Sequence, residues 1–225
     1  MKGSTLRLVA VALFAAVVAA AATREIDHRD ADARIFGAHA HLRGAALLAQ
    51  VRQRPPATLV FGDSLVEGTA IDTLCGEPAL AAGAWGARLA DIAAIAPAIV
   101  EAARPKRVVV AIGINDAVRA RPTDPAAFAA AYRALVTPWQ AAGLDVAVAL
   151  PAPVVRGRPL GDGNFDPARA ERLTEAIRAL AADLRLRLVP FDTLPRDANG
   201  GLDPALAPDG VHFAPEGYRL WQAIL

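Results

Sequence analysis

The chain has 225 residues, a length that suits one globular domain with a short additional segment. Apolar residues make up 54% of it, enough for a sizeable core, and the formal net charge of +1 excludes the strong basic field of a nucleic-acid-binding protein. The single cysteine, Cys75, excludes an internal disulfide and a cysteine-based zinc cluster, so we interpret it as a structural thiol.

The N-terminus has the pattern of a targeting segment. Lys2 and Arg7 precede an apolar run over residues 8–22, which ends in small residues suited to cleavage. The run is short for a membrane span, which needs about 20 residues. We therefore predict that residues 1–22 form a signal peptide, with an uncleaved membrane anchor as the alternative. Either form predicts export to the periplasm or beyond, the anchored one with a tether to the inner membrane.

Residues 23–55 are interpreted as a helical connector before a domain over residues 56–225. The segment is charged at first, then amphipathic, and ends at Pro55-Pro56. It contains His28, His39 and His41. Because positions i and i+2 of a helix do not share a face, we interpret His39 and His41 as solvated helix residues rather than metal ligands.

From residue 57 onward, short apolar runs alternate with helical patterns. This alternation predicts a parallel sheet covered on both faces, that is, an α/β three-layer α/β/α sandwich. We expect five parallel strands in the flavodoxin-like order 2-1-3-4-5. The predicted strands are 57–63, 78–83, 107–113, 144–151 and 186–191. The predicted helices are 87–103 (interrupted by Pro97), 124–143 and 166–185 (each beginning Asp-Pro), and 214–225.

Polar or glycine-rich stretches follow the first three predicted strands. Strand one ends in Gly62-Asp63-Ser64, strand two in residues 83–86 and strand three in residues 113–116. The carboxyl ends of parallel strands meet at one edge, where ligands bind at a topological switch point. We therefore expect the three loops to surround one cleft. Asp63 is expected to brace its turn through backbone hydrogen bonds.

A serine at a strand end acts as a nucleophile only with a base, and the base needs an orienting carboxylate. The only histidine in the predicted domain is His212, and Asp209 lies three residues before it. The amides of Ser64 and Gly86 and the side-chain amide of Asn115 are candidate donors to an oxyanion.

Four blocks in this order carry a resemblance to a known family: "GDSL" at 62–65, Gly86, "GIND" at 113–116 and "DGVHF" at 209–213. Together they resemble the GDSL, or SGNH, hydrolase family. The resemblance implies Ser64 as nucleophile, Asp209 and His212 as the rest of a catalytic triad, and Ser64, Gly86 and Asn115 as the oxyanion hole. It also implies ester or thioester hydrolysis with no metal and no cofactor.

Some positions depart from related patterns. Val66 stands where the G-x-S-x-G motif of α/β-hydrolases has its last glycine. Ala81-Ala82 replace an asparagine that the family often has in its second block, and Trp85 replaces a small residue. We expect Trp85 and Ile114 to line the substrate pocket, and the long loop 152–167 to influence specificity.

Each site residue also has an ordinary structural interpretation when taken alone. Ser64 can cap a helix, Asn115 and Asp209 can form turns, and His212 can lie on the surface. Three functions stay open: an exported ester hydrolase, an enzyme moving acyl groups on or off an envelope polysaccharide (an O-acetylesterase or O-acyltransferase), and a catalytically silent binding module. The expected partner is a small ester or an acylated envelope glycan or lipid, not a nucleic acid.

Overall fold

The structure, a computed structural model, describes residues 31–225. The predicted signal peptide and the first residues of the predicted connector lie outside this range. Residues 37–225 form one compact unit. Among the helices of residues 31–225, none is long and apolar enough to cross a bilayer.

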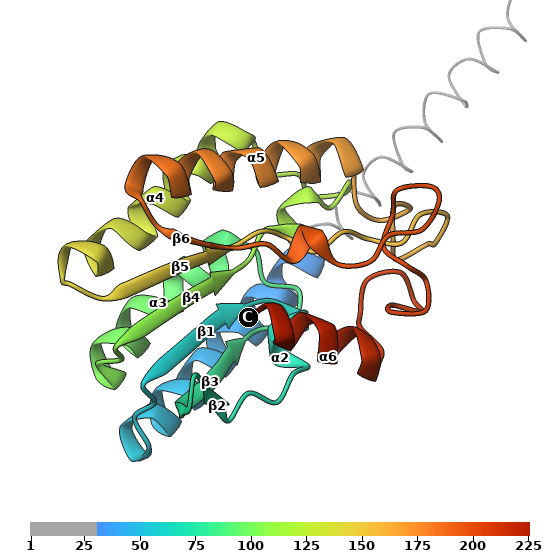
Figure 1. Cartoon of the computed structure of the whole chain (residues 1–225). Helices are drawn as coiled ribbons and strands as arrows, with labels where there is room; N and C mark the ends of the chain where they lie inside the picture. Colours follow the sequence, from blue (N-terminus) through green and yellow to red (C-terminus); the bar gives the residue numbers. More distant parts are fainter. Residues whose placement is uncertain (1–30) are drawn as a thin grey trace, which may run out of the picture. The chain divides into compact units, whose positions relative to one another are not determined.

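A mainly parallel sheet of six strands forms the centre of the compact unit, in the order β2-β3-β1-β4-β5-β6 (Figure 1). The five parallel strands follow the predicted order, so the predicted fold class is confirmed. Their bounds are β1 (Thr58–Gly62), β3 (Glu77–Gly83), β4 (Arg107–Ala111), β5 (Asp145–Ala149) and β6 (Arg187–Val189).

The sixth strand, β2 (Thr73–Leu74), was not predicted. It pairs antiparallel with β3 at the edge of the sheet. The two strands are joined by Cys75 and Gly76, which both have positive φ angles, 51° and 76°. Two consecutive residues of positive φ are typical of a tight hairpin turn. A two-residue strand has no detectable alternation, so its sequence carried no signal.

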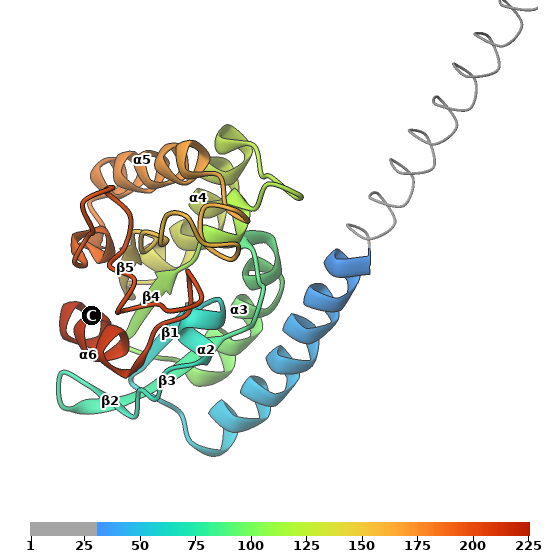
Figure 2. The same cartoon turned by 90° about the vertical axis from the view of Figure 1, so that its right-hand side faces the viewer.

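The two faces of the sheet bury separate hydrophobic clusters. Leu59 and Phe61 of β1 point to one face and pack with residues of the helix over 31–53 and of α3 (Leu89–Ala103), α4 (Pro125–Ala141) and α5 (Pro167–Leu184). Val60 points to the other face and packs with α2 (Ser64–Glu67), α6 (Pro215–Ile224) and the chain that leads to α6. Figure 2 shows α6 and α3 on opposite sides of the sheet.

Two long helices begin at the predicted Asp-Pro pairs. Asp124 accepts hydrogen bonds from the N–H groups of Ala126 and Ala127, and Asp166 caps α5 in the same way. The interruption predicted at Pro97 is wrong, because α3 runs continuously through it. Proline removes one backbone hydrogen bond, but the buried face of α3, which includes Ile92, Ala96 and Ile99, holds the helix in place.

The compact unit begins earlier than the predicted boundary at residue 56. Ala40, Leu47 and Val51 of the helix over 31–53 are buried in the core beside α3. Their spacing places them on one helix face, which explains the amphipathic pattern of the predicted connector. This part of the chain therefore contributes to the domain itself.

Candidate active site

The ends of three adjacent strands lie in register. Gly62, the last residue of β1, pairs with Gly83 of β3 on one side and with Ala111 of β4 on the other. The loops that follow these strands consequently leave the sheet at the same level. This register is what brings residues from the first three sequence blocks to one edge.

The short helix α2 packs directly on these strand ends. A Cβ atom at Gly62 would lie 2.3 Å from Cγ2 of Val66, and one at Gly83 would lie 2.2 Å from the backbone nitrogen of Glu67. Both distances are shorter than van der Waals contact allows. The two glycines therefore permit α2, and Ser64 at its first position, to sit close to the sheet edge.

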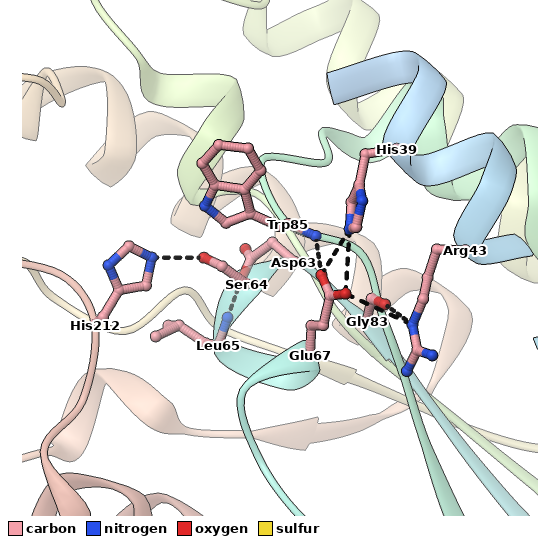
Figure 3. Close-up of polar contacts among 9 residues, drawn as sticks. All are labelled: His39, Arg43, Asp63, Ser64, Leu65, Glu67, Gly83, Trp85 and His212. Atoms are coloured by element: carbon pink, nitrogen blue, oxygen red, sulfur yellow. Dashed lines mark hydrogen bonds and ion pairs between the residues drawn. The ribbon is translucent and has the colours of Figure 1, made fainter. Parts of the chain in front are cut away.

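Ser64, His212 and Asp209 form a continuous hydrogen-bonded chain. Nε2 of His212 lies 3.0 Å from Oγ of Ser64 (Figure 3), and Nδ1 of His212 lies 2.7 Å from Oδ2 of Asp209. Because a carboxylate only accepts hydrogen bonds, Nδ1 carries the hydrogen, and Nε2 is left to accept the Ser64 hydroxyl proton. The arrangement has the geometry of a nucleophile, a base and an orienting acid.

The loop that carries His212 is held by the same carboxylate. Oδ1 of Asp209 accepts hydrogen bonds from the N–H groups of Val211 and His212. Partial burial pushes the pKa of Asp209 upward, but these N–H groups and the His212 ring outweigh it and hold that pKa below its usual value. Asp209 therefore stays ionised and holds His212 through both its backbone N–H and its Nδ1.

Two candidate oxyanion donors lie on neighbouring loops. Asn115, in the 3₁₀ turn Ile114–Ala117, is buried, and its Nδ2 donates a hydrogen bond of 3.0 Å to the carbonyl oxygen of Ala87. The second hydrogen of this amide can serve another acceptor. Gly86 precedes Ala87 directly and has a φ of +68°, a conformation that favours glycine. Asn115 and the turn containing Gly86 are thus physically linked.

Two buried carboxyl groups support these loops. Asp63 caps α2 by accepting a hydrogen bond of 3.0 Å from the N–H of Leu65, and burial raises its pKa to about 6. Asp116 accepts hydrogen bonds from the N–H of Leu89 and the hydroxyl of Thr123, and its pKa is also raised by burial. Asp63 therefore braces the Ser64 turn through a backbone hydrogen bond, as its position before the serine predicted.

Sequence comparison identifies the family. A sequence model of the GDSL-like lipase/acylhydrolase family matches residues 60–220, which contain all of the residues just described. The chain belongs to this family. A search of curated proteins finds no match.

Several solved structures share the fold. A GDSL-like lipase from Bacteroides thetaiotaomicron superposes with a TM-score of 0.63 at 20% identity, covering 75% of this chain and 85% of the other. An acetyl xylan esterase gives 0.61 at 19% identity, covering 74% and 96%. A lipase/acylhydrolase from Enterococcus faecalis gives 0.58 at 20% identity, covering 75% and 92%. At these identities the likeness establishes the fold.

The two expected pocket residues of this GDSL-family protein lie in different surroundings. Trp85 is 47% exposed and follows β3 in the same turn as Gly86. Ile114 is buried and lines a cavity of about 150 Å³ together with residues of loop 152–167 and α5. The lining of this cavity includes none of Ser64, Asp209 and His212.

A polar cluster that the sequence did not predict lies on the other side of α2. The side chain of His39 is 36% exposed rather than fully solvated, and its Nε2 lies 3.0 and 3.1 Å from the two carboxylate oxygens of Glu67. It also belongs to the compact unit, so His212 is not the only histidine of the folded domain. The buried face formed by Ala40, Leu47 and Val51 was the available signal that this helix packs on the domain.

No group of three or more His, Cys, Asp or Glu side chains is arranged to hold a metal ion within residues 31–225. The prediction that the protein needs no metal follows from the proposed serine chemistry, in which Ser64, His212 and Asp209 carry out the reaction. Chelation with EDTA, described below, tests it.

Proposed function

We propose that this GDSL-family protein is a serine hydrolase of carboxylic esters or thioesters, with Ser64 as nucleophile, His212 as general base and Asp209 as the residue that orients His212. The observation that carries the proposal is the chain of contacts from Ser64 Oγ to His212 Nε2, 3.0 Å, and from His212 Nδ1 to Asp209 Oδ2, 2.7 Å. Ser64 and His212 are 148 positions apart in the chain, whereas Asp209 and His212 are three positions apart.

In the proposed reaction, His212 removes the Ser64 proton as Oγ attacks the ester carbonyl carbon. The carbonyl oxygen becomes an oxyanion, which accepts hydrogen bonds from the N–H groups of Ser64 and Gly86 and from the Asn115 side chain. The tetrahedral intermediate collapses to an acyl-enzyme as protonated His212 gives its proton to the leaving alcohol. Water, activated by His212, then attacks the acyl-enzyme, releases the acid and restores Ser64.

We also propose that the protein is exported. The basic residues Lys2 and Arg7 and the apolar run over residues 8–22 support this inference. Fusion of residues 1–30 to a reporter enzyme that is active only outside the cytoplasm tests it, with Lys2 and Arg7 replaced by glutamate as the control. A reporter that stays inactive with the native segment would contradict export.

Hydrolysis is tested with p-nitrophenyl esters from acetate to palmitate and with a fluorophosphonate probe. The sequence has two serines, Ser4 and Ser64, so the labelled peptide can be assigned directly. We expect labelling at Ser64 and loss of both labelling and turnover in Ser64→Ala. Thr193→Ala, which removes an exposed hydroxyl elsewhere in the chain, is the matched control.

Near-wild-type turnover by Ser64→Ala would refute the proposed nucleophile. An absence of labelling and of turnover in the wild-type protein would instead favour a binding module. A parallel reaction with an added sugar acceptor separates hydrolysis from acyl transfer. Transfer yields an acylated sugar, whereas hydrolysis by water yields the free acid.

A further inference from the structure

Glu67 is a half-buried residue that joins α2, the turn after β3 and the helix over 31–53. It is the last residue of α2, three positions after Ser64. Its carboxylate accepts hydrogen bonds from the backbone N–H of Trp85 and from Nε2 of His39, while Nε of Arg43 lies 3.7 Å away (Figure 3). The side chain of Glu67 is 25% exposed, so these contacts are partly shielded from water.

The turn that these contacts reach is the one containing Gly86. The N–H of Ala87 donates to the carbonyl oxygen of Ala84, which closes a β-turn with Gly86 in the third position. Glu67 holds the peptide N–H of Trp85 on one side of Gly86. On the other side, the carbonyl oxygen of Ala87 accepts the hydrogen bond from Asn115. The amide of Gly86 therefore lies between two anchored peptide units.

Two side chains of the helix over 31–53, His39 and Arg43, lie against the Glu67 carboxylate. His39 contacts both carboxylate oxygens, so its Nε2 carries the hydrogen. Arg43 donates from Nε to the carbonyl oxygen of Gly83, 3.2 Å away, beside Glu67. A bare carboxylate near a developing oxyanion would oppose it electrostatically. His39 and Arg43 reduce this repulsion while they hold the Glu67 side chain in one orientation.

We propose that Glu67 is a positioning residue for the oxyanion hole, and that His39 and Arg43 assist it by fixing its carboxylate. By holding the Trp85 peptide, Glu67 sets the direction of the Gly86 N–H that follows. The helix over 31–53 thus contributes to catalysis through the turn, although it supplies no group to the substrate. This inference rests on the proposed esterase function.

The test compares Glu67→Ala and Glu67→Gln with the wild-type enzyme on p-nitrophenyl acetate. Loss of one complete oxyanion donor costs roughly 10²–10³ in kcat. Because Gly86 would be misdirected rather than removed, we expect Glu67→Ala to lower kcat by on the order of tenfold to a hundredfold with KM changed less than about threefold. Glutamine still accepts the Trp85 N–H, so Glu67→Gln should recover most of the activity.

An alkyl boronic acid provides a second readout, because its tetrahedral adduct with Ser64 places an oxygen in the oxyanion hole. Its inhibition constant should rise in Glu67→Ala by the same factor as kcat/KM falls. Glu77→Ala is the matched control, since Glu77 pairs with Lys106 at the other end of β3, and its kcat should not change.

An unchanged kcat in a folded Glu67→Ala protein would overturn the inference, as would a rise in KM alone. If Glu67→Ala does not fold, His39→Ala decides: we expect kcat to fall about threefold to tenfold, and an unchanged kcat would overturn the inference. The Ser64→Ala enzyme is assayed in parallel. Failure of the proposed function would appear there, as turnover that does not depend on Ser64.

Discussion

Replacing Asp63 by asparagine should make the protein more stable at neutral pH. The Asp63 side chain is buried, and burial raises its pKa from 3.8 to about 6. In the unfolded chain the carboxyl group returns to its ordinary pKa. A shift of about two units, at roughly 1.4 kcal/mol per unit, corresponds to about 3 kcal/mol of unfolding free energy.

The sign follows from proton binding. Between pH 4 and pH 6 the folded protein retains a proton on Asp63 that the unfolded chain releases. The unfolding free energy therefore decreases as pH rises through this range, and the full cost is present above about pH 6. Asparagine keeps the acceptor for the N–H of Leu65 but carries no charge, so it avoids this cost.

The assay is urea denaturation of wild type and Asp63→Asn at pH 4, 5, 6, 7 and 8. The stability difference between the two proteins isolates Asp63, because Asp116 and the histidines are common to both. We expect a difference near zero at pH 4 that grows to about 3 kcal/mol in favour of the variant at pH 7.

Asp124→Asn is the control, because Asp124 also caps a helix by accepting backbone N–H groups, but its side chain is exposed. It should change stability by less than about 0.5 kcal/mol at every pH, since asparagine and aspartate are similar N-caps. A difference for Asp63→Asn that stays flat between pH 4 and pH 8 would refute the argument that Asp63 is a destabilising buried carboxyl group.

Four further predictions concern the reaction. Asn115→Ala should lower kcat by on the order of 10²-fold with a smaller change in KM, and an unchanged kcat would remove Asn115 from the oxyanion hole. Asp209→Asn should lower kcat by on the order of 10⁴-fold, because asparagine presents an N–H to Nδ1 and favours the wrong His212 tautomer. Since hydrogen bonds hold the pKa of Asp209 below its usual value, the acid limb of wild-type kcat/KM should rise with a slope of one proton, and a slope of two would contradict this. EDTA should not inhibit hydrolysis, whereas activity lost on chelation and restored by zinc would favour a metal mechanism.

The parallel order of the sheet and the ends of its long helices could be predicted because their signals are local. The β-branched run of β4 favours a strand over its own residues. The Asp-Pro pairs at the start of α4 and α5 determine where these helices begin. The order of the GDSL blocks likewise lies in the sequence, and the family match confirms the resemblance that they carry. Loops that follow neighbouring parallel strands must meet at one edge, so the place of the candidate site followed from the fold.

Tertiary structure decided which side chains meet. The strand β2 is too short to show alternation, and the early start of the domain depends on the packing of Ala40, Leu47 and Val51 against distant residues. His39 and Glu67 are 28 residues apart, and nothing in the chemistry of either residue specifies the other as partner. Their contact exists because Gly62 and Gly83 allow α2 to approach the sheet edge while the helix over 31–53 packs beside it. Such contacts depend on the relative placement of whole elements, which local sequence patterns do not encode.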